Sequence, residues 1–160
     1  MREAQGGSAS AIEALFRTHW PQVHRTAYLV VHDAAAAEDI AQEAFLAAIR
    51  RLDRFDAARP FGAWLHRIVV NRAIDWARAR QLRREAGFDE PVAPEHTAEL
   101  SGDTLAALAA LTPEHRAVIV LRHVLGYSPG EIATLLDLPR GTVNSRLRRG
   151  LDTLEERLHS

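Results

Sequence analysis

Residues 128–149, with the sequence SPGEIATLLDLPRGTVNSRLRR, carry the local signals of two short helices joined by a tight turn. Ser128 suits an N-cap, Pro129 suits the first helical position, and Glu131 follows the cap by three residues, which together make a capping box. Asp137 stands in the turn, and aspartate tolerates the left-handed backbone conformation better than most residues. The segment therefore predicts a helix-turn-helix, the arrangement that places a second helix in the major groove of DNA.

The second of these helices has one apolar and one polar face. Its apolar residues recur at spacings of four, four, three and four, so we expect a buried stripe made of Val143, Leu147, Leu151, Leu154 and Leu158. The other face and its flanks carry side chains that can read base edges or bind phosphates. The expected DNA contacts are Arg140, Thr142, Asn144, Ser145, Arg146, Arg148 and Arg149. A helical hairpin with a solvated arginine face is the less favoured alternative.

Charge is distributed unevenly along this chain of 160 residues, whose formal net charge is only −1. Residues 50–84 contain ten arginines and three aspartates, whereas residues 85–103 contain six acids and no arginine. Residues 140–149 add four arginines and no acid. Two basic blocks separated by an acidic connector therefore indicate two DNA-facing surfaces, in spite of the nearly neutral total.

The connector also marks a domain boundary, because residues 85–102 hold two prolines, two glycines and no helical apolar repeat. The rest of the chain has helical periodicity and no sustained strand-like alternation. We expect an all-α fold of two small helical domains joined by a flexible linker. The expected limits are a disordered N-terminus at 1–9, a first domain at 10–84, an acidic linker at 85–103 and a four-helix domain at 104–160.

The sequence of the first domain predicts a bundle of longer helices. Pro21 is expected to break or kink its first segment, and Asp33 to cap a helix that runs to about Leu52. A polar patch on that helix, which by itself reads as a solvated face, is made of Asp39, Gln42, Glu43 and Leu46. The loop RFDAARPF sets Phe55 and Phe61 beside arginines, a combination that suits stacking on unpaired bases. Core anchoring is the favoured interpretation for Phe61, and for Phe55 the two interpretations are evenly matched.

Longer stretches of the chain resemble a known family. The segment AAEDIAQEAFLAAIRRLDRFDAARPFGAWLHRIVVNRAIDWAR resembles domain 2 of the extracytoplasmic-function sigma factors of bacterial RNA polymerase. The segment LTPEHRAVIVLRHVLGYSPGEIATLLDLPRGTVNSRLRRGLDTLEERL resembles their domain 4. The match covers roughly residues 10–82 and 104–158, in the family's order. The combined patterns AEDxxQExF, WLxRIxxNxxxD and EIAxxLxxPxGTVxSRLxR are far more specific than the helix-turn-helix alone.

The resemblance implies a sigma factor that binds core polymerase, recognises the −35 and −10 promoter elements and opens the duplex. The polar patch then docks on the clamp of the largest subunit, and the helix from Arg140 onward reads the −35 element. At the −10 element the implied base contacts are Phe55 and Asn71, with Arg72, Arg78 and Arg80 as backbone contacts. Further implied partners are the flap of the second-largest subunit and an anti-sigma factor. The implied location is the cytoplasm, or the membrane surface where an anti-sigma partner holds the chain.

Three positions depart from the family pattern: Ile49 replaces a common tryptophan, Asn144 a common lysine and Gly150 a common alanine. Gly150 costs the recognition helix about 1 kcal/mol relative to alanine, unless close packing needs it.

Two other classes of function compete with a sigma factor. A free-standing helix-turn-helix regulator would need neither the polar patch nor the RFDAARPF loop. A metal-dependent enzyme would have to use the eight histidines, but His19 and His24 lie about 140° apart on a helix and no HExxH pair occurs. We therefore expect no catalysis, no metal and no cofactor. The absence of cysteine excludes disulfides and thiolate metal sites.

Overall fold

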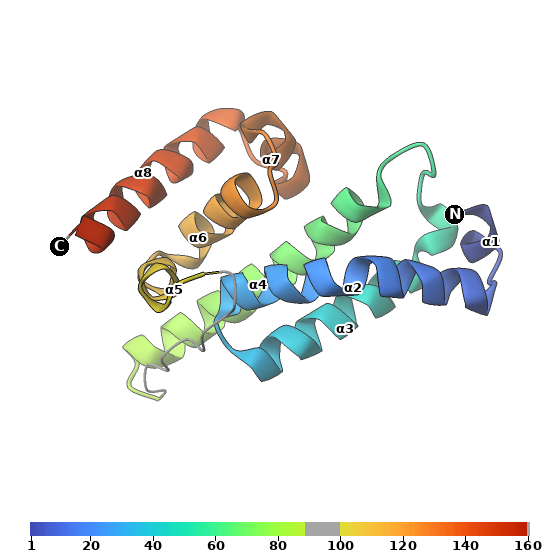
Figure 1. The fold of residues 1–160 in the computed structure, drawn as a ribbon, viewed down its shortest axis with the longest axis horizontal. Coiled ribbons are helices and arrows are strands. Elements are labelled where there is room, and N and C mark those ends of the chain that lie inside the picture. Colours follow the sequence, from blue (N-terminus) through green and yellow to red (C-terminus); the bar gives the residue numbers. More distant parts are fainter. Residues whose placement is uncertain (89–99, 160) are drawn as a thin grey trace.

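The computed structural model describes residues 1–88 and 100–159, and all regular elements in these two ranges are helical. The first range contains α1 (Arg2–Gln5), α2 (Ala9–Val31), α3 (Ala34–Arg50), the 3-10 turn η1 (Leu52–Arg54) and α4 (Phe61–Glu85). The second contains α5 (Gly102–Ala109), α6 (Pro113–Ile119), the π-helical turn η2 (Val120–Val124), α7 (Pro129–Leu136) and α8 (Arg140–His159). The expected all-α class is confirmed (Figure 1).

The first domain is a bundle of α2, α3 and α4 (Figure 1). Its core includes fully buried alanines, which let the helices approach closely, among the larger side chains: Val23, Ala27, Ala37, Ala41, Ala44, Phe45, Leu65, Val69 and Ala73. The predicted cap of α3 is confirmed, because the backbone N–H of Ala36 donates to Asp33 Oδ1 at 2.9 Å.

Two expectations for the N-terminal part are wrong. α2 is one continuous helix through the exposed Pro21, so the expected break does not occur. Residues 1–9 contain a helix instead of being disordered. Ala4 of this helix is 2% exposed, and Gln5 Nε2 donates to the carbonyls of Leu52 at 3.1 Å and Phe55 at 2.7 Å. Helix α1 therefore covers the apolar surface of the η1 turn.

The second domain buries a different stripe of α8 from the one expected. Leu151 and Leu158 are 43% and 47% exposed, whereas Gly150 is buried beside α6. A Cβ at Gly150 would lie 2.9 Å from Ile119 Cγ1, closer than side chains pack. The glycine is therefore needed where α8 meets α6. It takes the place of Leu151 in a stripe that continues from Val143 and Leu147 to the half-buried Leu154.

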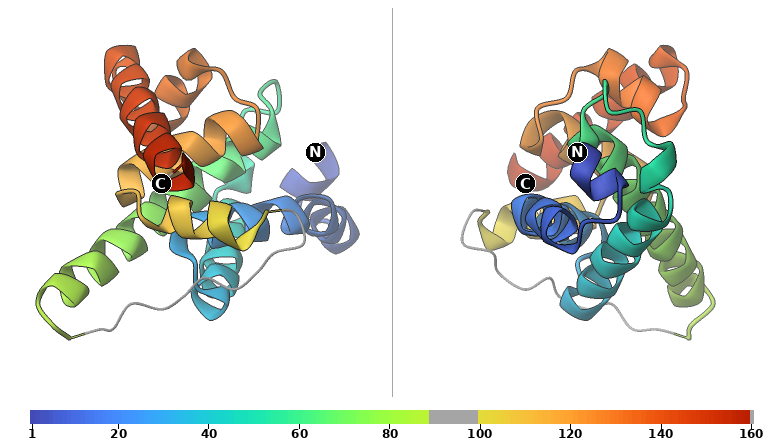
Figure 2. Two further views of the ribbon diagram at one scale, coloured as in Figure 1. Left: turned by 60° about the vertical axis from the view of Figure 1, so that its left-hand side comes forward. Right: turned by 90° about the vertical axis from the view of Figure 1, so that its right-hand side faces the viewer.

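The two domains pack against each other. Val70 and Ile74 of α4 belong to the same apolar cluster as the core of the second domain, and Leu29 of α2 packs with Leu105 and Val120. α4 contacts both α6 and α7, whereas α8 packs on α5, α6 and α7, on the far side of its domain (Figure 2). The stretch 89–99 of the expected linker lies outside the described residues. In the part that is described, no helix has the length and apolarity that crossing a bilayer requires.

Candidate nucleic-acid interface

The helix-turn-helix forms as its local sequence predicts. Ser128 Oγ accepts the backbone N–H of Glu131 at 3.1 Å, and Glu131 Oε1 accepts that of Ser128 at 2.9 Å, so the capping box is complete. Asp137 ends α7 with φ 55° and ψ 51°, which is the left-handed conformation expected in the turn. These contacts fix the angle at which the chain enters α8.

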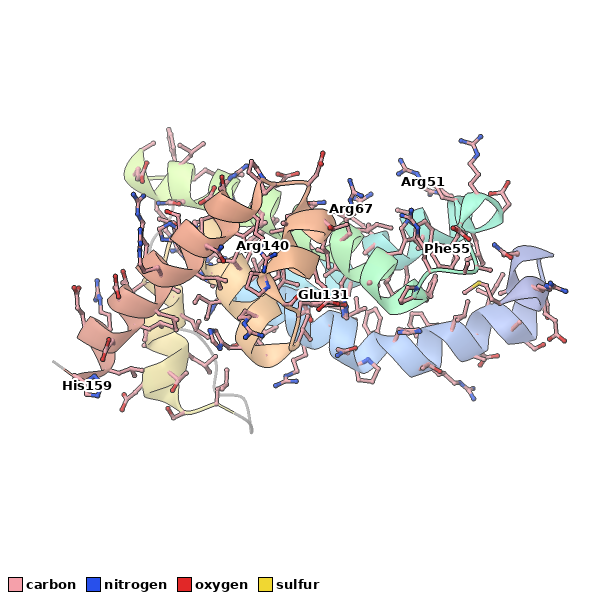
Figure 3. All side chains as sticks on the ribbon, turned by 90° about the horizontal axis from the view of Figure 1, so that it is seen from above. Arg51, Phe55, Arg67, Glu131, Arg140 and His159 are labelled. Atoms are coloured by element: carbon pink, nitrogen blue, oxygen red, sulfur yellow. The ribbon has the colours of Figure 1, made fainter. Side chains whose placement is uncertain are left out.

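The polar face of α8 is open to solvent. Its exposed members are Arg140, Asn144, Arg148 and Arg149, and its half-buried members are Thr142, Ser145 and Arg146. Val143 and Leu147 hold the opposite face in the core. Arg140 at the start of α8 lies toward the middle of the molecule, and His159 at the other end of the helix lies at one end of the molecule (Figure 3). The arrangement leaves seven polar side chains available on one helix; their DNA contacts stay a prediction.

Phe55 is not the exposed stacking platform that the loop sequence suggested. Its ring is 8% exposed and stacks on Trp64, with ring centroids 4.8 Å apart. Phe61 meets it edge-on at 5.6 Å, and Ala4 of α1 packs in the same cluster. Phe55 is therefore a core residue in this structure, and it is buried in part because α1 packs over it. Phe61 packs against both this cluster and the bundle core, as expected.

The polar residues of α4 differ in how available they are. Asn71 is exposed, and exposed Arg72 lies 3.4 Å from Glu43 of α3. Arg78 forms an ion pair with Glu114 of the second domain. Although burial by itself raises the pKa of Glu114, the hydrogen bond from Arg78 brings that pKa below its ordinary value.

Arg80 is the exception among the expected backbone contacts. Its side chain is only 13% exposed, donates to Asp33 Oδ2 at 2.8 Å and lies over the ring of Trp76 at 5.1 Å. The backbone N–H of Ala36 and then this guanidinium hold the pKa of Asp33 below its usual range, against the effect of burial. Arg80 therefore ties α4 to the start of α3 in the chain without DNA, and its expected contact with the DNA backbone stays a prediction.

The polar patch of α3 is presented as a continuous exposed face. Asp39, Gln42 and Glu43 are exposed, and Leu46 at the same face is 52% exposed. Ile49, one turn further on, is 38% exposed. A row of polar and acidic side chains that ends in uncovered aliphatic ones is therefore open to contact by another protein, and docking at this face stays a prediction.

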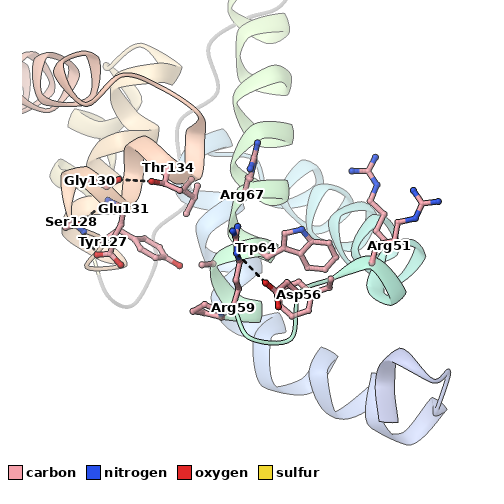
Figure 4. Close-up of a pocket in the computed structure, with 15 residues that line it drawn as sticks. Arg51, Asp56, Arg59, Trp64, Arg67, Tyr127, Ser128, Gly130, Glu131 and Thr134 are labelled. Carbon is pink, nitrogen blue, oxygen red and sulfur yellow. Dashed lines mark hydrogen bonds and ion pairs between the residues drawn. The ribbon is translucent and has the colours of Figure 1, made fainter. Parts of the chain in front are cut away.

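A groove of about 1050 Å³ separates the two domains beside the Phe55 loop (Figure 4). Trp64 and Arg67 of α4 lie on one side of it, and Tyr127 with the start of α7 lies on the other. Four arginines line it: Arg51, Arg54, Arg59 and Arg67. The sequence pointed to the loop that contains Arg54 and Arg59, but it assigned neither Arg51 nor Arg67 to a site. The high number of arginines in residues 50–84 was the one feature of the sequence that pointed to a basic groove here.

The alternative metal-dependent enzyme would need a cluster of ligands. Over residues 1–88 and 100–159, no three histidine, cysteine, aspartate or glutamate side chains are grouped so that they could hold a metal ion.

Comparisons with known proteins agree with this geometry. The family model for Sigma-70 region 2 matches residues 15–83, and that for Sigma-70 region 4 matches residues 101–154. The chain is 30% identical to the ECF RNA polymerase sigma factor SigW of Bacillus subtilis, over 99% of this chain and 94% of SigW. It is 37% identical to SigL of Mycobacterium tuberculosis, over 94% of this chain and 90% of SigL. It is also 37% identical to SigE of Mycolicibacterium smegmatis, over 91% of this chain but only 61% of SigE.

Two solved structures share the arrangement of helices. The sigma factor RpoE of Bartonella quintana, in complex with the anti-sigma factor NepR, superimposes with a TM-score of 0.79 at 24% identity, over 94% of this chain and 98% of RpoE. CnrH, in complex with the cytosolic domain of CnrY, gives 0.73 at 28% identity, over 99% and 94%. The exposed polar face of α8, the arginines of α4 and the acidic face of α3 thus lie within two matched regions in the family's order. This chain belongs to the extracytoplasmic-function (ECF) sigma factors of the sigma-70 family.

Proposed function

We propose that this chain binds core RNA polymerase and directs it to one class of promoters. The observation that carries the proposal is the exposed face of Asp39, Gln42, Glu43 and Leu46 on α3. A free-standing DNA reader has no use for such a face. A subunit that must dock on the polymerase clamp needs one, and aliphatic side chains beside acids suit both affinity and orientation.

Recognition of the −35 element falls to α8. Its N-terminal half presents the side chains that suit base edges and phosphates: Arg140, Thr142, Asn144, Ser145, Arg146, Arg148 and Arg149. The left-handed turn at Asp137 and the buried Val143 hold this half of the helix against α7 and the domain core. Position and chemistry therefore both favour insertion into the major groove.

Recognition of the −10 element involves α4 and the groove beside the loop of residues 54–61. Exposed Asn71 would contact a base, and exposed Arg72 and Arg78 would bind phosphates once their carboxylate partners release them. A base that leaves the duplex would enter a groove with four arginines and an aromatic wall. Phe55 is part of that wall rather than a free platform. Stacking and phosphate binding there offset an opening cost of a few kcal/mol per base.

Polymerase makes these two contacts cooperative. Each domain reads only a few base pairs, which is too little for tight specific binding. When polymerase holds both domains at the spacing of the two promoter elements, the second contact becomes intramolecular and gains a high effective concentration. The chain performs no covalent step in this scheme. By analogy with RpoE, which was solved with the anti-sigma factor NepR, we also propose an anti-sigma partner and action in the cytoplasm.

Charge reversal on α3 tests the proposal. Asp39→Arg with Leu46→Arg changes the docking face and leaves Glu43, which also pairs with Arg72, intact. Glu13→Arg on α2 is the matched control, since its exposed pair with Arg17 contributes little. We expect the α3 variant to lose co-purification with core polymerase and promoter-directed transcription, and the control to keep both. A variant that keeps full transcription in spite of the reversal would instead indicate a free-standing regulator.

A further inference from the structure

Gln5 of α1 holds the start of the loop that joins α3 to α4. Its side-chain amide has two N–H groups, and Nε2 donates to the carbonyl of Leu52 at 3.1 Å and to that of Phe55 at 2.7 Å. Leu52 begins η1, and Phe55 follows it with an extended backbone, φ −69° and ψ 131°. The buried Ala4 anchors α1 in the same apolar cluster. One amide therefore bridges the two ends of a turn that lies 47 to 50 residues further along the chain.

The bond to Phe55 sets the direction in which the loop leaves η1. The carbonyl of Phe55 lies in the peptide plane that joins it to Asp56, so holding this oxygen holds the plane. Residues 56–60, which follow, are all exposed. They form a turn in which Asp56 Oδ1 accepts the N–H of Ala58 at 3.0 Å and the carbonyl of Asp56 accepts that of Arg59 at 2.9 Å. The turn therefore takes its orientation from the plane at its start.

This loop forms part of the groove that is proposed to receive the opened strand. Arg54, Asp56 and Arg59 line the groove, and the last two lie on the loop (Figure 4). Gln5 is not one of the lining residues that the described part of the chain contributes, so it acts on the groove through the loop. A loop that already has its bound conformation loses less entropy when a base binds, and it holds its contacts in a tighter geometry.

We propose that Gln5 is a positioning residue for the −10 element, because it holds residues 56–60 in the orientation in which they meet an unpaired base. The inference rests on the proposed function for what enters the groove, and on the two hydrogen bonds for the position of the loop. Removing the amide leaves every proposed DNA contact of the chain in place. Recognition of the −10 element should therefore weaken, while recognition of the −35 element by α8 should not.

The test is a promoter competition with polymerase that carries the full chain. The promoter found by run-off transcription competes with a copy that has one base pair of its −10 element replaced, and separately with a copy altered in its −35 element. Gln5→Ala is expected to lower the −10 preference about fivefold and to leave the −35 preference unchanged. A residue that merely stabilised the fold would lower transcription from all templates alike and change neither preference.

Two further variants separate the hydrogen bonds from packing. Gln5→Glu keeps the length of the side chain but, as a carboxylate, has no N–H to donate, so it should behave like Gln5→Ala. Glu3→Ala, at an exposed position of the same helix, is the matched control and should leave both preferences unchanged. Full −10 preference in Gln5→Glu would overturn the role of the two hydrogen bonds.

Hydrogen exchange of the free chain reports the position of the loop without polymerase. The amides of Phe55, Ala58 and Arg59 are hydrogen-bonded and fall within residues 52–60. Gln5→Ala should speed their exchange at least about fivefold and leave that of α4 unchanged. Unchanged exchange of the loop overturns its positioning by Gln5, and faster exchange with an unchanged −10 preference overturns the role in recognition. A failure of the proposed function shows separately, as no promoter-directed transcription with the unsubstituted chain. That result also removes the role at −10, while exchange still shows whether Gln5 holds the loop.

Discussion

Gly150→Ala should destabilise the second domain, although alanine is the better helix former. Gly150 lies in the middle of α8 and is buried against α6. An added Cβ would stand 2.9 Å from Ile119 Cγ1, 3.1 Å from Ile119 Cδ1 and 3.7 Å from His115 Cβ. Ile119 is 4% exposed and belongs to the domain core, so it has little room to withdraw. Helix α8 would have to move away from α6, and with it the polar face that we propose for DNA binding.

The magnitude follows from two opposing effects. Helix propensity favours alanine over glycine by about 1 kcal/mol. Overpacking a filled core costs about 1–3 kcal/mol. We expect a net loss of about 1 kcal/mol in the free energy of unfolding, measured as a lower urea midpoint in circular dichroism at 222 nm with an unchanged slope.

Gly141→Ala, on the same helix, is the matched control. A Cβ at Gly141 would meet nothing within 4 Å, so only the propensity effect remains and the variant should gain about 0.5–1 kcal/mol. Ile119→Val removes the Cδ1 contact and should cost less in the Gly150→Ala background than alone, with a coupling energy of at least about 0.5 kcal/mol. The reasoning is refuted if Gly150→Ala stabilises the chain as much as Gly141→Ala does.

Two further predictions concern buried groups. Burial lowers the pKa of His32 and of His66 to about 4, so between pH 6.5 and 4 the unfolded chain binds more protons and stability falls as pH falls. Each histidine contributes up to about 3 kcal/mol, fully present above pH 6.5. His32→Asn, which tolerates the left-handed φ of 55°, should remove about half of this pH dependence of the urea midpoint, whereas exposed His123→Asn should leave it intact. Separately, Asp33→Ala removes a helix cap and the partner of Arg80, and thermal unfolding should show a loss of about 1–3 kcal/mol. Asp33→Asn, which keeps the cap and loses only the ion pair, should lose less, and equal losses would contradict a contribution of the cap.

Local signals predicted the helix ends well. The capping box at Ser128, the cap at Asp33 and the left-handed turn at Asp137 depend on neighbours within four residues, and all three form as expected. The resemblance to domains 2 and 4 likewise gave the family and the order of the two regions, because both motifs are contiguous in the sequence.

Three features that the sequence did not predict share a physical cause, since each depends on a contact between distant segments. Phe55 is buried because α1 covers it through Gln5, fifty residues away in the chain. Arg80 is withdrawn from solvent by Asp33. The buried stripe of α8 passes through Gly150 because Ile119 of α6 occupies the space beside it. Periodicity within one helix contains no information on which neighbour it will meet.

The central claim is that this chain makes core polymerase initiate at defined promoters. Run-off transcription with purified core polymerase and pooled genomic fragments tests it most directly, with core polymerase alone as the baseline. We predict discrete transcripts whose start sites share one upstream pair of −35 and −10 sequences and which disappear when the chain carries Asp39→Arg with Leu46→Arg. Transcripts no different from those of core polymerase alone, on every fragment, would contradict the account.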